Sequence, residues 1–134
     1  MAIRIPMILF DTCTLLWLSS DQAKLSKAAI SAWENSSGRR YFSAISMFEI
    51  AQKVTIKKLF LPQSLSKWRQ ELTRLFLLEE IPVDSSVAFK AAALPPIHKD
   101  PFDPLIIATA LIHKLTIVTC DEKIIQYPRL KTLW

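Results

Sequence analysis

The sequence predicts an α/β fold, in which a central parallel sheet of four to five strands is flanked by helices on both faces. Two observations lead to this prediction. Short apolar runs alternate along the chain with longer segments whose apolar residues recur at helical spacing. The chain has 134 residues, of which 51% are hydrophobic, and this length fits one hydrophobic core. We therefore expect residues 1–134 to form a single domain.

The expected strands are apolar runs that end in turns or polar residues. The first run is continuous and stops at Asp11, which is typical of a parallel strand that is buried on both faces. Another expected strand, Leu115–Val118, leads into Thr119, Cys120 and Asp121. In chain order the expected strands are Ile5–Phe10, Tyr41–Ser43, Leu77–Val83, Leu115–Val118 and Lys131–Leu133.

Helices are expected between these strands. Within one of them, Trp68 lies among leucines at helical spacing, which indicates an amphipathic helix. Ser46 followed three residues later by Glu49 has the pattern of a capping box, and Asp103 before Pro104 is an ordinary helix start. In chain order the expected helices are Thr12–Leu18, Ser26–Asn35, Ser46–Lys53, Leu65–Leu75, Ser86–Ala93 and Asp103–His113, with a short helix after Asp121.

Composition excludes several classes of function. Gly38 is the single glycine, so neither a glycine-rich phosphate loop nor a dinucleotide-binding fingerprint is present. The apolar stretches are too short to span a bilayer, and we expect no association with a membrane. Cys13 and Cys120 are far apart in the sequence and form no C-x-x-C pair, as expected for free thiols in a reducing cytoplasm. The net charge of +5 suits a polyanionic substrate such as nucleic acid.

Four acidic residues are expected to meet at one edge of the sheet. Asp11 and Asp121 each follow a strand, while Glu49 and Asp103 stand near the starts of helices. Ligands of open parallel sheets bind at the carboxyl ends of the strands, so all four positions lie where a site would form. Neighbouring carboxylates repel one another unless a cation offsets their charge, and hard oxygen ligands suit Mg²⁺ or Mn²⁺.

A purely structural interpretation of these acids is also open. Asp is a favoured helix N-cap, and Asp11, Asp103 and Asp121 all precede helices. The capping box gives Glu49 a structural role as well. Ser, Thr or Asn would cap equally well, so the presence of carboxylates at all four positions favours a metal site.

The chain resembles the PIN-domain nucleases, and among them the short VapC-type toxins of bacterial toxin–antitoxin pairs. The resemblance covers nearly the whole chain and depends on the order and spacing of several motifs. They are Ile8–Thr12, Ser43–Ala51, Leu94–Asp103, Ile106–Ala110 and Ile117–Asp121.

This resemblance implies a PIN-like domain that hydrolyses RNA phosphodiester bonds with Mg²⁺ or Mn²⁺. Asp11, Asp103 and Asp121 would bind the metal, and Glu49 would be a ligand or position the water. Thr119, and less so Thr12, would hydrogen-bond to ligand carboxylates. For Asp100 we favour a turn before Pro101 over a role as metal ligand. A homodimer and a cognate antitoxin are the implied partners, with residues 59–61 and the first helices as the antitoxin groove.

Two other functions remain open at this point. One is a phosphatase or phosphotransferase with Asp11 as nucleophile, although this class usually has a second acid at the position of Cys13. The other is a non-catalytic module that binds RNA or a protein partner.

Overall fold

The computed structural model describes residues 6–36, 38–97 and 99–134. Its sheet has the order β3-β2-β1-β4-β5, and every pair of neighbouring strands is parallel. The strands are β1 (Ile8–Phe10), β2 (Arg40–Ser43), β3 (Glu79–Ile81), β4 (Thr116–Val118) and β5 (Thr132–Leu133). The predicted fold class is confirmed. Of the predicted features, Ile5, at the start of the first expected strand, lies outside the described residues.

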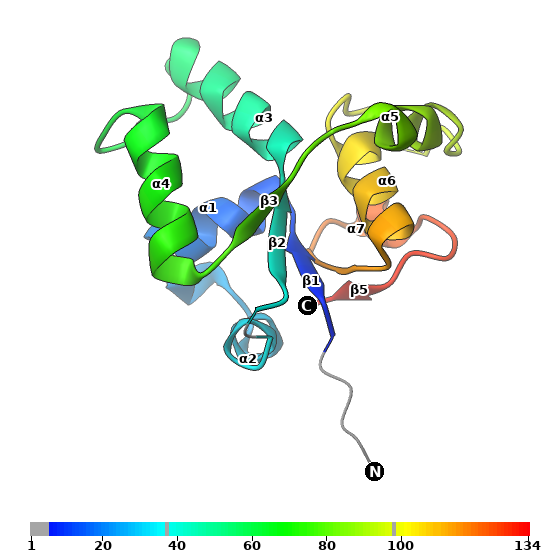
Figure 1. The fold of residues 1–134 in the computed structure, drawn as a ribbon, viewed down its shortest axis with the longest axis horizontal. Helices are drawn as coiled ribbons and strands as arrows, with labels where there is room; N and C mark the ends of the chain where they lie inside the picture. The colour runs from blue at the N-terminus through cyan, green and yellow to red at the C-terminus, as the bar shows by residue number, and fades with distance from the viewer. Residues whose placement is uncertain (1–5, 37, 98) are drawn as a thin grey trace.

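Helices cover both faces of this sheet. They are α1 (Thr12–Ser20), the short 3-10 helix η1 (Gln22–Lys24), α2 (Lys27–Glu34), α3 (Ala44–Thr55), α4 (Leu65–Phe76), α5 (Ser85–Ala92), α6 (Asp103–His113) and α7 (Glu122–Ile125). Figure 1 shows α1 to α4 on one side of the strands and α5 to α7 on the other. Among the described residues, no helix is both long enough and apolar enough to cross a membrane.

The alternation of side chains along β1 divides the core into two clusters. Ile8 and Phe10 face the cluster that includes residues of α1, α2 and α4, while Leu9 faces the cluster built on α6. All three side chains are fully buried. A strand with apolar residues at every position is therefore explained by burial on both faces.

One predicted strand begins too early. The sequence predicts a strand from Leu77, but β3 starts at Glu79 because Leu77 ends α4. Leu77 adopts the left-handed conformation, with φ 55° and ψ 50°, and thereby closes the last turn of the helix. Leucine rarely adopts the left-handed conformation, so the sequence around Leu77 does not indicate that a helix ends there.

The strand order reverses its direction beside β1. Strands β2 and β3 are added to the sheet on one side of β1, and β4 and β5 are added on the other side. In open parallel sheets, ligands bind at the carboxyl ends of the strands where the strand order reverses, which is called the topological switch point. That point lies between β1 and β4, at Asp11 and Thr119.

Candidate active site

The register of the sheet brings the ends of three strands to one level. Phe10 pairs with Phe42 of β2 and with Val118 of β4. The residues that follow these strands, Asp11 and Thr119 among them, therefore lie side by side at the same edge. This arrangement is the convergence of strand ends that the sequence predicts.

Asp11 is held by bonds from α1 and from the residue that follows β4. It caps α1, as predicted, because its Oδ1 accepts a hydrogen bond from the backbone N of Thr14 at 2.9 Å and another from the Thr14 hydroxyl. Its Oδ2 accepts a bond of 2.5 Å from Thr119 Oγ1. Burial raises the pKa of Asp11, and the bonds from Thr119 and Thr14 act in the opposite direction.

Thr119 connects two of the acids. Its hydroxyl donates to Asp11 and accepts a 3.0 Å hydrogen bond from the backbone N of Asp121. Asp121 in turn caps α7, because its Oδ1 accepts from the backbone N of Lys123 at 2.9 Å. The structure thus places Thr119 against a carboxylate, as the sequence predicts.

Glu49 lies on α3, and the predicted capping box is wrong. The cap of α3 is Ser43, whose Oγ accepts a bond of 3.1 Å from the backbone N of Ile45, so the helix begins at Ala44. Ser46 is buried inside the helix, and its Oγ lies 3.0 Å from Oγ1 of Thr12. Thr12 therefore joins α1 to the helix that carries Glu49. The alternative role of Glu49 in a capping box is excluded.

The carboxylate of Glu49 is held by one oxygen alone. Oε2 accepts a bond of 3.1 Å from Nζ of Lys53, one helical turn further along α3. Oε1 is buried and has no hydrogen-bond partner within the described parts of the chain. Burial lowers the pKa of Lys53, but the bond and charge of Glu49 outweigh it and the pKa is raised. A buried carboxylate oxygen without a partner is costly, and a bound cation would satisfy it.

Asp103 is the first residue of α6, and its predicted role as N-cap is wrong. The N-cap position belongs to Phe102, whose side chain makes no capping bond. Asp100 supplies the bonds instead, since its Oδ1 accepts from the backbone N of Phe102 at 2.7 Å and of Asp103 at 3.2 Å. Asp100 thus forms the turn that the sequence favours, and its carboxylate accepts the bonds at the start of α6.

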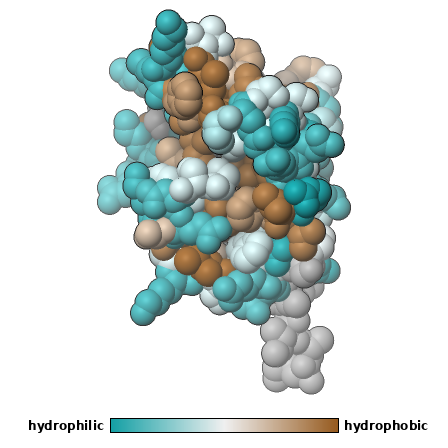
Figure 2. All heavy atoms as spheres, turned by 90° about the vertical axis from the view of Figure 1, so that its left-hand side faces the viewer, coloured by the Kyte–Doolittle hydropathy of each residue, from teal (hydrophilic) through white to brown (hydrophobic). Residues whose placement is uncertain are grey.

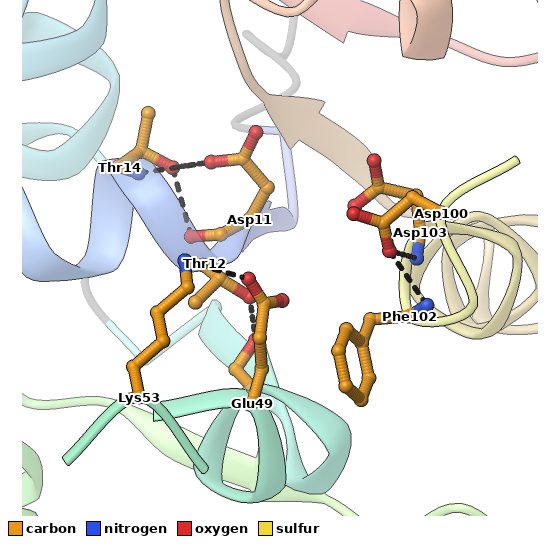
Figure 3. Close-up of polar contacts among 9 residues, drawn as sticks. Asp11, Thr12, Thr14, Glu49, Lys53, Asp100, Phe102 and Asp103 are labelled. Carbon is orange, nitrogen blue, oxygen red and sulfur yellow. Dashed lines mark hydrogen bonds and ion pairs between the residues drawn. The ribbon is translucent and has the colours of Figure 1, made fainter. Parts of the chain in front are cut away.

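The charges of the four acids act on one another. Burial, followed by the negative charges of nearby acids, raises the pKa of Asp103 to about 7; these acids are Asp100, Asp121, Asp11 and Glu49. Figure 3 shows the side chains of Asp11, Glu49 and Asp103 around one space, each from a different element. We call Asp11, Glu49, Asp103 and Asp121 the acid cluster.

The acid cluster fits a divalent cation in its chemistry. Its donors are hard carboxylate oxygens, which Mg²⁺ and Mn²⁺ prefer, and Oε1 of Glu49 is buried and without a partner. No three of the acidic, histidine or cysteine side chains in the described residues are already grouped closely enough to hold an ion. His98 lies outside the described residues.

An aromatic contact braces two of the elements that carry acids. The rings of Phe48 on α3 and Phe102 before α6 are tilted against each other, with 5.7 Å between their centroids. Each phenylalanine directly precedes an acid of the cluster, Glu49 or Asp103. The contact therefore limits how far these two carboxylates can move apart.

Sequence reasoning missed two residues of this site. Thr14 has a signal in the sequence, because a hydroxyl three residues after an N-cap Asp can approach its carboxylate. Lys53 also has one, since Glu and Lys four residues apart face each other on a helix. Neither pattern shows that the pair lies at the edge of the sheet where the site forms, because that depends on the strand order.

Comparisons with known proteins agree with this geometry. The model of the PIN domain family matches residues 8–130. Ribonuclease VapC22 of Mycobacterium tuberculosis (strain ATCC 25618 / H37Rv) is 33% identical over 130 residues, which cover 95% of this chain and 98% of that protein.

Solved structures share the fold at lower identity. DNA-bound VapBC from Salmonella typhimurium has a TM-score of 0.69 and 16% identity, and the match covers 96% of this chain and 97% of that one. FitAcB from Neisseria gonorrhoeae has a TM-score of 0.62 and 22% identity, covering 96% and 97%. With the family model matching nearly the whole chain and a relative at 33% identity, this chain belongs to the PIN domain family.

Proposed function

We propose that this chain is an Mg²⁺- or Mn²⁺-dependent endoribonuclease and the toxin of a toxin–antitoxin pair. The observation that carries the proposal is the acid cluster at the switch point of the sheet, with the buried Oε1 of Glu49 left for a cation. The family supports it, since the relative at 33% identity is named a ribonuclease and several structural neighbours are VapBC complexes. The domain comprises residues 1–134.

Each residue of the acid cluster has a proposed role. Asp11, Asp103 and Asp121 hold the cation, and Glu49 binds it or orients the attacking water. When bound, the ion activates water and offsets the negative charge that develops on the phosphate. Thr119 and Thr14 fix the carboxylate of Asp11 so that its direction does not change during the reaction. The exposed thiols of Cys13 and Cys120 suit a protein that acts in the cytoplasm.

The deciding experiment replaces single acids by the matching amide. Asp11→Asn and Asp121→Asn keep the helix caps, because Asn caps a helix about as well as Asp, so folding is retained. Asp103→Asn removes a charge at a residue that is not the N-cap of α6. Each change is expected to lower Mg²⁺-dependent cleavage of RNA at least about a hundredfold. The matched control is Asp84→Asn, since Asp84 caps α5 through a bond of 3.0 Å from Val87 N.

Two outcomes would contradict the proposal. If Asp11→Asn and Asp121→Asn cleaved RNA at the unmodified rate, the metal site would be assigned to the wrong residues. Hydrolysis of a small phosphomonoester with RNA left intact would instead favour the phosphatase with Asp11 as nucleophile. RNA binding without cleavage in Mg²⁺ or Mn²⁺ would favour the non-catalytic module.

We further propose that the cognate antitoxin binds an apolar groove of about 450 Å³ between α1, α4 and the loop 59–63. Figure 2 faces this side of the molecule and shows apolar surface gathered there between hydrophilic regions. Trp68 forms part of the groove wall but is buried in the core, as expected. A helix or strand with regularly spaced apolar side chains fits such a groove. The apolar residues that line it are Leu16, Trp17, Leu59, Phe60, Leu61, Pro62, Trp68, Leu72, Leu75 and Phe76.

We also propose a homodimer, supported by the outer surface of α3. Phe48 and Ile56 are more than half exposed there and line a hollow of about 510 Å³. Large exposed apolar side chains of this kind mark association surfaces. Ile56→Lys is expected to give a monomer in sedimentation velocity, and a dimer that persisted in this variant would place the interface elsewhere.

A further inference from the structure

Lys53 brings a positive charge into the acid cluster. Its Nζ lies 3.1 Å from Oε2 of Glu49, and the side chains of the two residues are 38% and 10% exposed. The negative charge of Asp100 also acts on this ammonium group. Figure 3 shows Lys53 reaching from α3 along Glu49 towards the side of the cluster where Asp11 and Thr12 lie. Lys53 is thus a component of the site and not of the solvated outer face of the helix.

The two oxygens of Glu49 have different surroundings. Oε2 is bound to Lys53, while Oε1 is buried and has no partner within the described residues. A cation on Oε1 would not have to displace the lysine. It would, however, bind beside a unit positive charge, and like charges at short range oppose each other.

Two effects of Lys53 on metal binding have opposite signs. By holding Oε2, it restricts the rotation of Glu49, which favours binding; an i,i+4 ion pair of this kind changes an equilibrium about twofold. By its charge, it opposes a dication, and at a partly exposed position in salt this changes the affinity about three- to tenfold. The repulsion is the larger effect.

We propose that Lys53 is an internal counter-ion of the acid cluster, which stabilises the metal-free protein and lowers the affinity of the site for a divalent cation. This inference rests on the proposed metal-dependent function. In the metal-free state Lys53 offsets part of the repulsion among the four carboxylates. Once a dication is present, the same charge opposes it. Lys53 is a positioning residue, because it acts through Glu49 and through its charge.

The test measures Mn²⁺ binding directly, without RNA. Free Mn²⁺ is quantified by its paramagnetic resonance signal during titration of the whole chain, and the melting temperature is recorded without metal. Lys53→Met is expected to bind Mn²⁺ about three- to tenfold more tightly and to melt at a lower temperature in the absence of metal. Lys53→Arg keeps the charge and is expected to restore the unmodified affinity.

The matched control is Lys24→Met. Lys24 of η1 forms an ion pair of 3.7 Å with Asp21, which lies between α1 and η1, and the two side chains are 60% and 48% exposed. This change removes the same charge and an ion pair of similar sequence spacing, so it is expected to leave Mn²⁺ affinity unchanged. Lys53→Gln provides a second variant at the site, and it is expected to tighten Mn²⁺ binding as Lys53→Met does.

The possible outcomes separate this inference from the proposed function. If the unmodified protein binds Mn²⁺ and Lys53→Met and Lys53→Gln bind it equally or more weakly, the counter-ion role is wrong and the metal site stands. If Lys24→Met tightens binding as much as Lys53→Met, the effect is one of net charge and the inference also fails. If the unmodified protein binds no Mn²⁺ at millimolar concentration, the metal-dependent function is wrong, and the inference falls with it.

Discussion

Thr119 Oγ1 donates a hydrogen bond of 2.5 Å to Asp11 Oδ2 and so joins the ends of two neighbouring strands, β4 and β1. The same hydroxyl accepts from the backbone N of Asp121. A hydroxyl has one hydrogen and two lone pairs, so it can make both bonds at once. Thr119 therefore connects the carboxylate of Asp11 to the backbone of Asp121.

Thr119→Val tests this connection, because valine has nearly the same shape as threonine and lacks the hydroxyl. We expect RNA cleavage to fall about 10- to 100-fold, as is common when a group that orients a metal ligand is removed. Stability should fall by about 1–3 kcal/mol, because the buried Asp11 carboxylate loses a donor. Cleavage rates and thermal unfolding measure the two effects. Thr116→Val, on the same strand but before the site, is the control, and an equal loss of activity there would contradict the prediction.

Asp103→Asn is expected to stabilise the metal-free protein. Burial and, to a smaller extent, the neighbouring negative charges together raise the pKa of Asp103 from an ordinary value of 3.8 to about 7. The folded chain then binds more protons than the unfolded chain between these two values, so stability falls as pH rises from about 4 to about 7. The amide removes this dependence. Above pH 7 the gain is expected to be about 1 kcal/mol or more, as one pKa unit corresponds to about 1.4 kcal/mol.

Denaturant unfolding in a chelator, at several pH values, measures this gain. The difference between Asp103→Asn and the unmodified protein should be small at pH 4 and grow towards pH 7. A constant difference across this range would show that ionisation of Asp103 does not oppose folding. With Mn²⁺ added, the order is expected to reverse, because the unmodified protein alone gains the full binding energy of the ion.

The cap of α3 is tested by a pair of glycine substitutions. Ser43→Gly changes the N-cap, where glycine costs only a few tenths of a kcal/mol relative to serine. Ser46→Gly is expected to cost about 1–2 kcal/mol, because it places glycine inside a helix and removes the buried bond to Thr12. Urea denaturation of the two variants compares these costs. The reverse order would indicate that Ser46 caps the helix after all.

The fold and the position of the acids could be predicted because they depend on local patterns. The continuous apolar run before Asp11 identifies a buried strand, and the topology of parallel sheets then brings strand ends to one edge. Asp11 directly follows β1, and Asp121 lies three residues after the end of β4, so their placement required no knowledge of tertiary contacts. Their caps in α1 and α7 are confirmed as well.

The exact starts of α3 and α6 could not be predicted, because they depend on contacts between elements. Ser43 and Ser46 both fit an N-cap pattern, and the pairing of β2 with β3, which extends to Ser43, leaves the chain to enter α3 at once. In the same way, Asp100 and Asp103 both fit the start of α6, and only the structure shows that Asp100 accepts the backbone bonds there. The contact of Lys53 with Glu49 can be recognised from their spacing, but its place in the site depends on the neighbouring strand ends.

Phe60→Asp tests the antitoxin groove. Phe60 lines the groove and is 93% exposed, so its replacement should change the stability of the toxin by less than about 0.5 kcal/mol. A charge in an apolar contact surface is costly, and we expect the affinity for the cognate antitoxin to fall at least about tenfold. Isothermal titration of purified antitoxin into the toxin measures this. Phe89→Asp is the matched control, because Phe89 is 75% exposed on α5, on the other side of the sheet. If both variants bound the antitoxin as the unmodified toxin does, residues 59–63 would not form its binding surface.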